Sequence, residues 1–335
     1  MKQRYSSSTW AILAGLRFVL AAVVLISHLG EFRPTHFDLA PVAQLGARAA
    51  VLGFLLISGF SVGYSYVHNP KGYFSRRFLR IYPLYLFAVL AAWLLVMGIG
   101  EEFTLSGRSL HAGDWKAGLG NLLFLQGFTV WSLGYNGPLW TLGVEVFFYA
   151  LAPLLSRVNV QVLAGIILLS MLAFVRFAYP WMYGYVAFRY CWPWLIGFII
   201  ATRSHNRLVP LMLFGGLLVT LKNKSDTGEP LSVLTYSVAA GCILYLNHYR
   251  VAISTTIQRL LNLLGELSYP LYLFHYPIYI FAYRYLNIRN TWAFLALVLF
   301  SSIVLNQVLD HWLKRVFWKP AVAWLAQKYR RLSFA

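Results

Sequence analysis

The sequence predicts an all-α membrane protein, a polytopic helix bundle with about ten transmembrane helices. Hydrophobic residues make up 59% of the 335 residues and charged residues only 11%. So few charges would not cover the surface of a soluble protein of this size. Apolar runs long enough to cross a bilayer recur along the whole chain. We therefore expect one transmembrane domain over residues 1–335, without an appended soluble domain.

The apolar runs define ten spans and one shorter segment. The segment 119–131 is apolar but brief and carries Gln126. We expect it to form a re-entrant or interfacial helix on the outer side, buried against protein. The ten predicted spans are 10–29, 46–66, 79–99, 138–156, 160–178, 188–202, 208–222, 231–248, 267–286 and 292–313.

The net charge of +18 follows from membrane topology, and we expect no nucleic-acid partner. With a cytoplasmic N-terminus, 17 of the 28 Lys and Arg fall on the inner side and nine on the outer side. Glu31, Asp38, Glu101, Glu102, Asp114, Asp226 and Glu229 fall on the outer side. This positive-inside pattern predicts two cytoplasmic termini in a multi-pass cell-membrane protein, located in the inner membrane if the cell is Gram-negative. The inner Lys and Arg are Lys2, Arg4, Lys71, Arg76, Arg77, Arg80, Arg157, Arg203, Arg207, Arg250, Arg259, Lys314, Arg315, Lys319, Lys328, Arg330 and Arg331.

Two ionisable residues interrupt the first apolar run, Arg17 and His28. Ionisable side chains at such depth are expensive, which favours a functional role. Helix geometry brings them to within about 20° of one face, about 16 Å apart along the axis. We expect a polar seam in which His28 accepts a hydroxyl proton as a general base. The alternative is a histidine that hydrogen-bonds a neighbouring helix.

Glu145 is the only carboxylate in the apolar stretch 138–149. It lies about 10 Å along the helix from Pro138, at a depth compatible with His28. A carboxylate that orients an imidazole is a common arrangement around a general base. The alternative is a structural ion pair with Arg17 or Arg176.

An arginine cluster lies at the expected cytoplasmic start of the third span, within residues 75–83. Arg76, Arg77 and Arg80 stand at i, i+1 and i+4, so Arg76 and Arg80 share a helical face. Guanidinium groups bind phosphates bidentately, and several together suit a polyphosphate. The alternative is that they anchor the helix to anionic lipid.

Two further segments contain small or aromatic residues at suggestive spacings. In residues 264–277, Tyr269, Tyr272 and His275 are spaced i, i+3, i+6, which also fits a packed aromatic stripe. In residues 54–60, Ser58 and Gly59 would let another backbone or a thin ligand approach, although small residues also pack membrane helices.

These segments resemble, in order, the motifs of the type-3 acyltransferases, membrane enzymes that O-acylate carbohydrates and other small acceptors. The chain departs from the family where Val146 and Phe147 replace a polar pair and Thr141 replaces a commoner Ser. Many relatives also carry an extra transmembrane helix and a soluble esterase-like domain. The matching segments are Gly15–Arg17 with His28, then 54–60, 76–83, 138–149 and 264–277.

The resemblance implies an O-acyltransferase that moves an acyl group, most often acetyl, from cytoplasmic acyl-CoA to a carbohydrate hydroxyl. The acceptor would be a surface polysaccharide or its lipid-linked precursor, with acetyl-CoA as donor and no metal. Glu145 would orient His28, and residues 157–260 would shape the acceptor pocket. The expected catalytic residues are His28, Glu145 and Arg17, the donor-binding residues Arg76, Arg77, Arg80, Tyr82 and Ser58, and the pocket-lining residues Trp140, Tyr269, Tyr272 and His275.

A different class of function also fits the buried polar residues. His28 and Glu145 would then form the proton relay of a proton-coupled transporter or lipid-glycan flippase. Paired halves with interrupted helices are common in such proteins, and the sequence shows no internal symmetry. A plain membrane scaffold would not need an arginine and a histidine within a helix.

Overall fold

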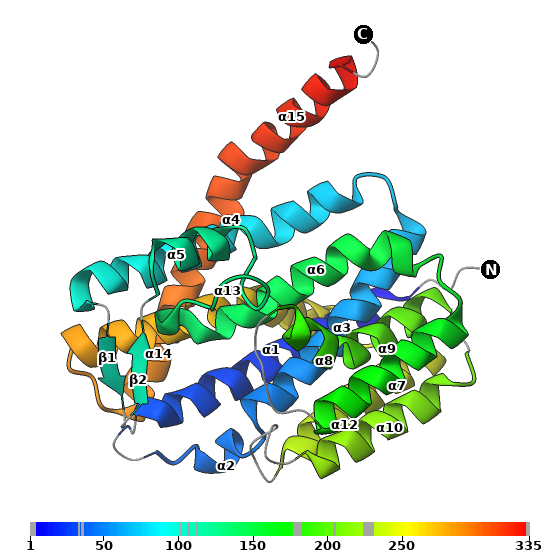
Figure 1. The fold of residues 1–335 in the computed structure, drawn as a ribbon, viewed down its shortest axis with the longest axis horizontal. Helices are drawn as coiled ribbons and strands as arrows, with labels where there is room; N and C mark the ends of the chain where they lie inside the picture. The colour runs from blue at the N-terminus through cyan, green and yellow to red at the C-terminus, as the bar shows by residue number, and fades with distance from the viewer. Residues whose placement is uncertain are drawn as a thin grey trace.

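A computed structural model describes residues 5–32, 34, 37–100, 102–105, 108–111, 113–176, 183–203, 206–223 and 231–332. The described chain is helical apart from one short β hairpin (Figure 1). Some of the charges used above to predict topology lie outside these residues, namely Lys2, Arg4, Arg33, Glu101, Lys224, Asp226 and Glu229.

Each predicted span coincides with helical structure over its described residues, as expected from the apolar runs; residues 177 and 178 of the span 160–178 lie outside them. The helices are α1 (Ser7–Leu29), η1 (Gly30–Phe32), α2 (Ala40–Ala43), α3 (Ala47–His68), α4 (Tyr73–Ile99), α5 (Trp115–Leu122), η2 (Gly134–Leu139), α6 (Trp140–Leu155), α7 (Val160–Arg176), α8 (Tyr185–Arg189), α9 (Cys191–Thr202), α10 (Val209–Lys222), α12 (Ser232–His248), α13 (Thr255–Tyr285), α14 (Thr291–Leu305), η3 (Asn306–Trp318) and α15 (Lys319–Leu332).

Five helical stretches of the described chain are long and apolar enough to cross a membrane. Three shorter apolar helices, α7, α9 and α10, accompany them. The count of ten crossings and the cytoplasmic side of both termini stay predictions. The five stretches are Ser7–Phe32, Ala47–His68, Tyr73–Ile99, Gly134–Leu155 and Thr291–Gln327.

Helices α1 and α13 lie side by side and run in the same direction. Near their starts, the Gln258 side chain donates to Ser8 Oγ at 3.3 Å. Further along, the Tyr279 hydroxyl donates to the Leu25 carbonyl at 3.3 Å. This long contact brings two distant parts of the sequence, each carrying a histidine, to the same depth of the bundle.

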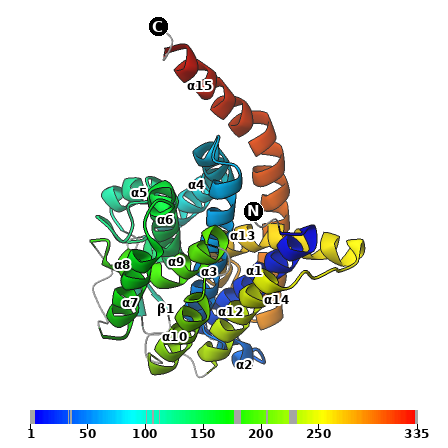
Figure 2. The same cartoon turned by 90° about the vertical axis from the view of Figure 1, so that its right-hand side faces the viewer.

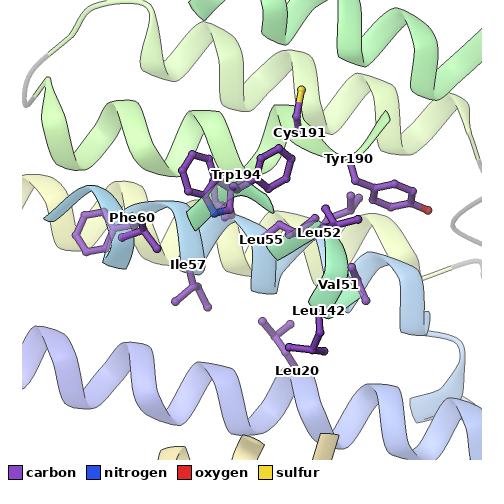
Figure 3. Close-up of a cluster of buried hydrophobic side chains, with 14 of the residues drawn as sticks. Leu20, Val51, Leu52, Leu55, Ile57, Phe60, Leu142, Tyr190, Cys191 and Trp194 are labelled. Carbon is purple, nitrogen blue, oxygen red and sulfur yellow. The ribbon is translucent and has the colours of Figure 1, made fainter. Parts of the chain in front are cut away.

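Helices α3 and α9 form the closest helix crossing of the core. A Cβ atom added at Gly59 would lie 1.9 Å from the Trp194 carbonyl oxygen, and one at Gly197 would lie 2.0 Å from the Leu56 carbonyl oxygen. Figure 3 shows Trp194 on one side of α3 and Leu20 of α1 on the other. The small residues of segment 54–60 thus admit another backbone, which was one of the two predicted uses.

The segment between α4 and α6 departs in part from the expectation of a purely helical chain. Strands β1 (Glu102–Leu105) and β2 (Arg108–His111) pair antiparallel. Helix α5 follows, capped by Asp114, and ends at Leu122; its eight residues span only about 12 Å, too little to cross a bilayer. Gln126 is buried beyond it and donates to the Leu139 carbonyl at 2.9 Å.

The chain ends in a long helical arm. Helix α14 continues through the π-helical segment η3 into α15, which extends away from the bundle in both views (Figures 1 and 2). Lys314 and Asp310 of η3 form an ion pair at 2.7 Å. Trp318, at the end of η3, packs edge-on against Tyr82 of α4 with ring centroids 5.8 Å apart, so the arm is anchored on α4.

Candidate active site

A cavity lies between α1, α3, α4, α6 and α13, and it collects most of the predicted site residues. It encloses about 800 Å³, a figure that includes its open mouth. Its lining combines charged, hydroxyl-bearing and apolar side chains. The lining residues are Arg17, Val51, Phe54, Leu55, Ile57, Ser58, Ser61, Arg77, Arg80, Ile81, Thr141, Leu142, Glu145, Tyr149, Ser268, Tyr269 and Tyr272.

The Glu145 carboxylate is held by two hydroxyl groups. Ser58 Oγ donates to Glu145 Oε1 at 2.7 Å, and the Tyr149 hydroxyl donates to the same oxygen at 2.5 Å. Tyr149 lies one helical turn after Glu145, so the two side chains share a face of α6. Within the described chain, no cation lies at ion-pair distance from this carboxylate. The structure therefore does not support the alternative interpretation of an ion pair with Arg17 or Arg176, although Arg17 lines the same cavity.

Three arginines line the cavity around this carboxylate, namely Arg17, Arg77 and Arg80. Arg77 Nη2 donates to the Ser61 carbonyl at 3.2 Å, and its guanidinium carbon lies 5.3 Å from the Tyr149 ring centroid. Arg80 is exposed, so it marks the mouth of the cavity. Three guanidinium groups and one carboxylate leave a cationic surface, which suits an anionic ligand.

Arg76 and Tyr82 do not line this cavity. Arg76 points back to the loop before α4, where it donates to the carbonyl oxygens of Asn69 and Lys71. Tyr82 stacks on Phe78 with ring centroids 4.9 Å apart. We expected Arg76 and Arg80 to face the ligand together, because they share one face of α4. The cavity is lined instead by Arg77 and Arg80.

Two of the predicted pocket-lining tyrosines reach the cavity. The Tyr269 hydroxyl donates to the Ile81 carbonyl at 2.9 Å. The Tyr272 hydroxyl lies 2.7 Å from Thr141 Oγ1 and donates to the Pro138 carbonyl at 3.1 Å. Trp140 does not line the cavity; its ring packs against that of Tyr190, 5.0 Å away.

His28 and His275 meet next to Tyr272, and neither histidine is among the residues that line the cavity. His28 Nδ1 lies 3.0 Å from His275 Nε2, and the two ring planes are nearly parallel, with an interplanar angle of 17°. His275 is completely buried, whereas His28 is half-buried. The ring centroids of Tyr272 and His275 lie 6.1 Å apart. Tyr272 therefore contacts both the cavity and the histidine pair.

The structure pairs His28 with a different residue from the one expected. The hydrogen bonds of Glu145 go to Ser58 and Tyr149, and His275 lies against His28 Nδ1. Glu145 therefore does not orient His28. Glu145 instead lines the cavity together with Arg17, which precedes His28 by about 16 Å along α1.

Sequence reasoning missed several lining residues. Tyr149 follows Glu145 by four residues and Ser61 follows Ser58 by three, so helical spacing was the available signal. Thr141 was noted in the sequence only because it replaces the commoner Ser of the family motif, and it was not predicted to line the cavity. The partnership of His28 with His275 had no local signal, because it depends on how α1 packs against α13.

The chain belongs to the type-3 acyltransferase family. The family profile, described as an acyltransferase domain, matches residues 10–311, which include the cavity and both histidines. The predicted membership is thereby confirmed.

A curated relative is similar to part of the chain. Acyltransferase MdmB of Streptomyces mycarofaciens is 31% identical over 156 residues, which is 43% of this chain and 38% of the relative. The aligned region thus spans less than half of each protein. No solved structure gives a significant match to this chain.

Proposed function

We propose that this protein is a membrane O-acyltransferase that moves an acyl group, most often acetyl, from acyl-CoA to a hydroxyl of a carbohydrate. The observation that carries the proposal is the cationic cavity, one of whose lining residues, Tyr272, lies next to the hydrogen-bonded pair of His28 and His275. Family membership and a relative named an acyltransferase support the same chemistry.

The donor would bind through its phosphates. Arg80 presents its guanidinium group at the mouth, and Arg77 and Arg17 line the same cavity. Guanidinium groups form strong, often bidentate hydrogen bonds with phosphate oxygens. The cytoplasmic position of this mouth, and hence of the donor, follows from the predicted positive-inside topology.

The acyl end would lie toward Tyr272 and the histidines. His28 would accept the proton of the acceptor hydroxyl while that oxygen attacks the thioester carbonyl carbon. The carbon–oxygen bond forms, the carbon–sulfur bond breaks, and the proton passes to the CoA thiolate. A positioned general base of this kind contributes roughly 10²- to 10⁴-fold to the rate.

The acceptor would be a sugar of a surface polysaccharide or of its lipid-linked precursor. Several aromatic side chains surround the histidines, and Tyr276 lies edge-on to His28 with ring centroids 5.5 Å apart. Its hydroxyl donates to Glu31 Oε2 at 3.0 Å, one helical turn beyond His28. A hydrogen-bonding carboxylate and an aromatic ring beside the base are groups that suit a sugar hydroxyl.

The test is transfer of label by the purified full chain. The protein is incubated in detergent with acetyl-CoA labelled in the acetyl group and a surface-glycan fraction, and the glycan is examined by mass. We expect ester-linked acetyl on the glycan and release of free CoA. A chain that moves glycan or protons across vesicles without labelling an acceptor would instead be a transporter or flippase.

A further inference from the structure

The second histidine of the pair has a defined hydrogen-bond arrangement. His275 Nδ1 lies 2.9 Å from the Tyr272 carbonyl oxygen and 3.1 Å from the Leu271 carbonyl oxygen. A carbonyl oxygen only accepts hydrogen bonds, so His275 Nδ1 carries a proton. In the neutral ring, the lone pair then lies on Nε2.

That lone pair faces His28. His275 Nε2 lies 3.0 Å from His28 Nδ1, so His28 Nδ1 carries the proton that is shared between the rings. A neutral His28 then has its own lone pair on Nε2, at the opposite edge of the ring. The chain of hydrogen bonds begins at two carbonyl oxygens of α13 and sets the tautomer of a residue on α1.

Packing fixes the orientation of both rings. The histidine ring planes are nearly parallel, with centroids 5.2 Å apart, an arrangement that allows an in-plane hydrogen bond between the two ring edges. Tyr279 lies edge-on to His275 at 6.0 Å, and the same tyrosine is bonded to the Leu25 carbonyl of α1. His275 is completely buried, so water does not compete for its Nε2.

We propose that His275 is a positioning residue that fixes His28 in the Nδ1–H tautomer and thereby makes His28 Nε2 the atom that accepts the acceptor's proton. This inference rests on the proposed acyl transfer. It assigns to a histidine the part that a carboxylate plays in many hydrolase triads, where loss of the correct tautomer costs several orders of magnitude in rate.

Two substitutions separate positioning from packing. His275→Gln keeps a side-chain acceptor, Oε1, near the place of Nε2, whereas His275→Phe keeps a ring of similar size without an acceptor. We expect the Phe variant to lower kcat at least 100-fold with the donor KM within threefold, and the Gln variant to recover at least tenfold of that loss. A Phe variant within threefold of the wild type, or Gln and Phe variants that are equally impaired, would overturn the assignment.

A second readout needs no catalysis. Two-bond ¹H–¹⁵N spectra of the full chain with ¹⁵N-histidine report which ring nitrogen carries the proton, and His28→Ala assigns the His28 signal. We expect an Nδ1–H tautomer for His28 in the wild type and its loss in His275→Phe, while thermal unfolding shows that both variants fold. An Nε2–H tautomer in the wild type overturns the inference. Failure of the wild type to transfer acetyl refutes the proposed function separately, because the spectra do not depend on transfer.

Discussion

The two ends of the polar seam on α1, at Arg17 and at His28, differ in their charge and in the side chains around them. Around Arg17, three arginines and one carboxylate line an open cavity, and the carboxylate is held by hydroxyl groups. Around His28, two imidazole rings lie among tyrosines in nearly parallel planes and are joined by one hydrogen bond. Under the proposed function, the first region would bind the charged donor and the second would hold the transferred proton. One helix would then carry a binding end and a chemical end.

Among the substitutions that test this comparison, removal of the His28 side chain should lower kcat the most. His28→Ala deletes the proposed base but leaves the arginine cavity intact. We expect kcat to fall by roughly 10²- to 10⁴-fold with little change in the KM for acetyl-CoA, measured with labelled donor. A similar loss in donor affinity would mean that donor binding and proton transfer are not separated between the two ends of α1.

Removal of the arginine charges that line the cavity should weaken binding of the donor and leave the chemical step largely unchanged. A hydrogen bond to a charged group contributes about 1.5–3 kcal/mol, so Arg77→Ala with Arg80→Ala should raise the acetyl-CoA KM on the order of 100-fold. Arg76→Ala is the matched control, because Arg76 bonds to loop carbonyl oxygens and should change KM less than threefold. Equal effects of Arg76 and Arg80 substitutions would argue for general attraction of phosphate to a basic surface.

Substitution of Glu145 tests whether His28 is oriented by His275, its partner in the structure, or by Glu145, the partner expected from the sequence. Glu145→Gln keeps an oxygen for Ser58 or Tyr149, so we expect kcat to fall less than tenfold. A carboxylate that oriented the base would show a loss nearer 10⁴-fold on amide substitution, as in a serine-protease triad. Comparison of kcat for Glu145→Gln and His275→Phe therefore decides which residue supports His28.

A substitution at the α3–α9 crossing should have the smallest effect on the kinetic constants. Gly59→Ala forces the two backbones apart, since the added Cβ would lie 1.9 Å from the Trp194 carbonyl oxygen. Overpacking of this kind costs about 1–3 kcal/mol, which should lower the thermal midpoint while donor KM stays within threefold. Gly241→Ala on α12 is the control, because nothing lies within 4 Å of its added Cβ; equal midpoints would contradict the packing role.

Sequence reasoning predicted features that depend on local chemistry. Apolar runs predicted the helices, because a helix is the simplest way to satisfy backbone hydrogen bonds in lipid. The arginine cluster and the glutamate were found by charge in an apolar setting, and Arg17, Ser58, Tyr269 and Tyr272 reach the predicted cavity.

Features that depend on packing between distant segments could not be predicted. His28 meets His275 only because α1 and α13 run parallel in one register, which no local pattern encodes. The choice of Arg77 over Arg76 depends on how α4 is rotated against α3 and α6. The β hairpin lies in a loop whose alternation was too short to indicate strands.

The most direct test of the account is a structure of the full chain with a thioether analogue of acetyl-CoA, which cannot transfer its acyl group. We predict phosphate oxygens at hydrogen-bond distance from Arg77 and Arg80, and the acyl carbonyl past Tyr272, close to His28 Nε2. An analogue bound outside the cavity, or one whose acyl end points away from the histidine pair, would contradict the account.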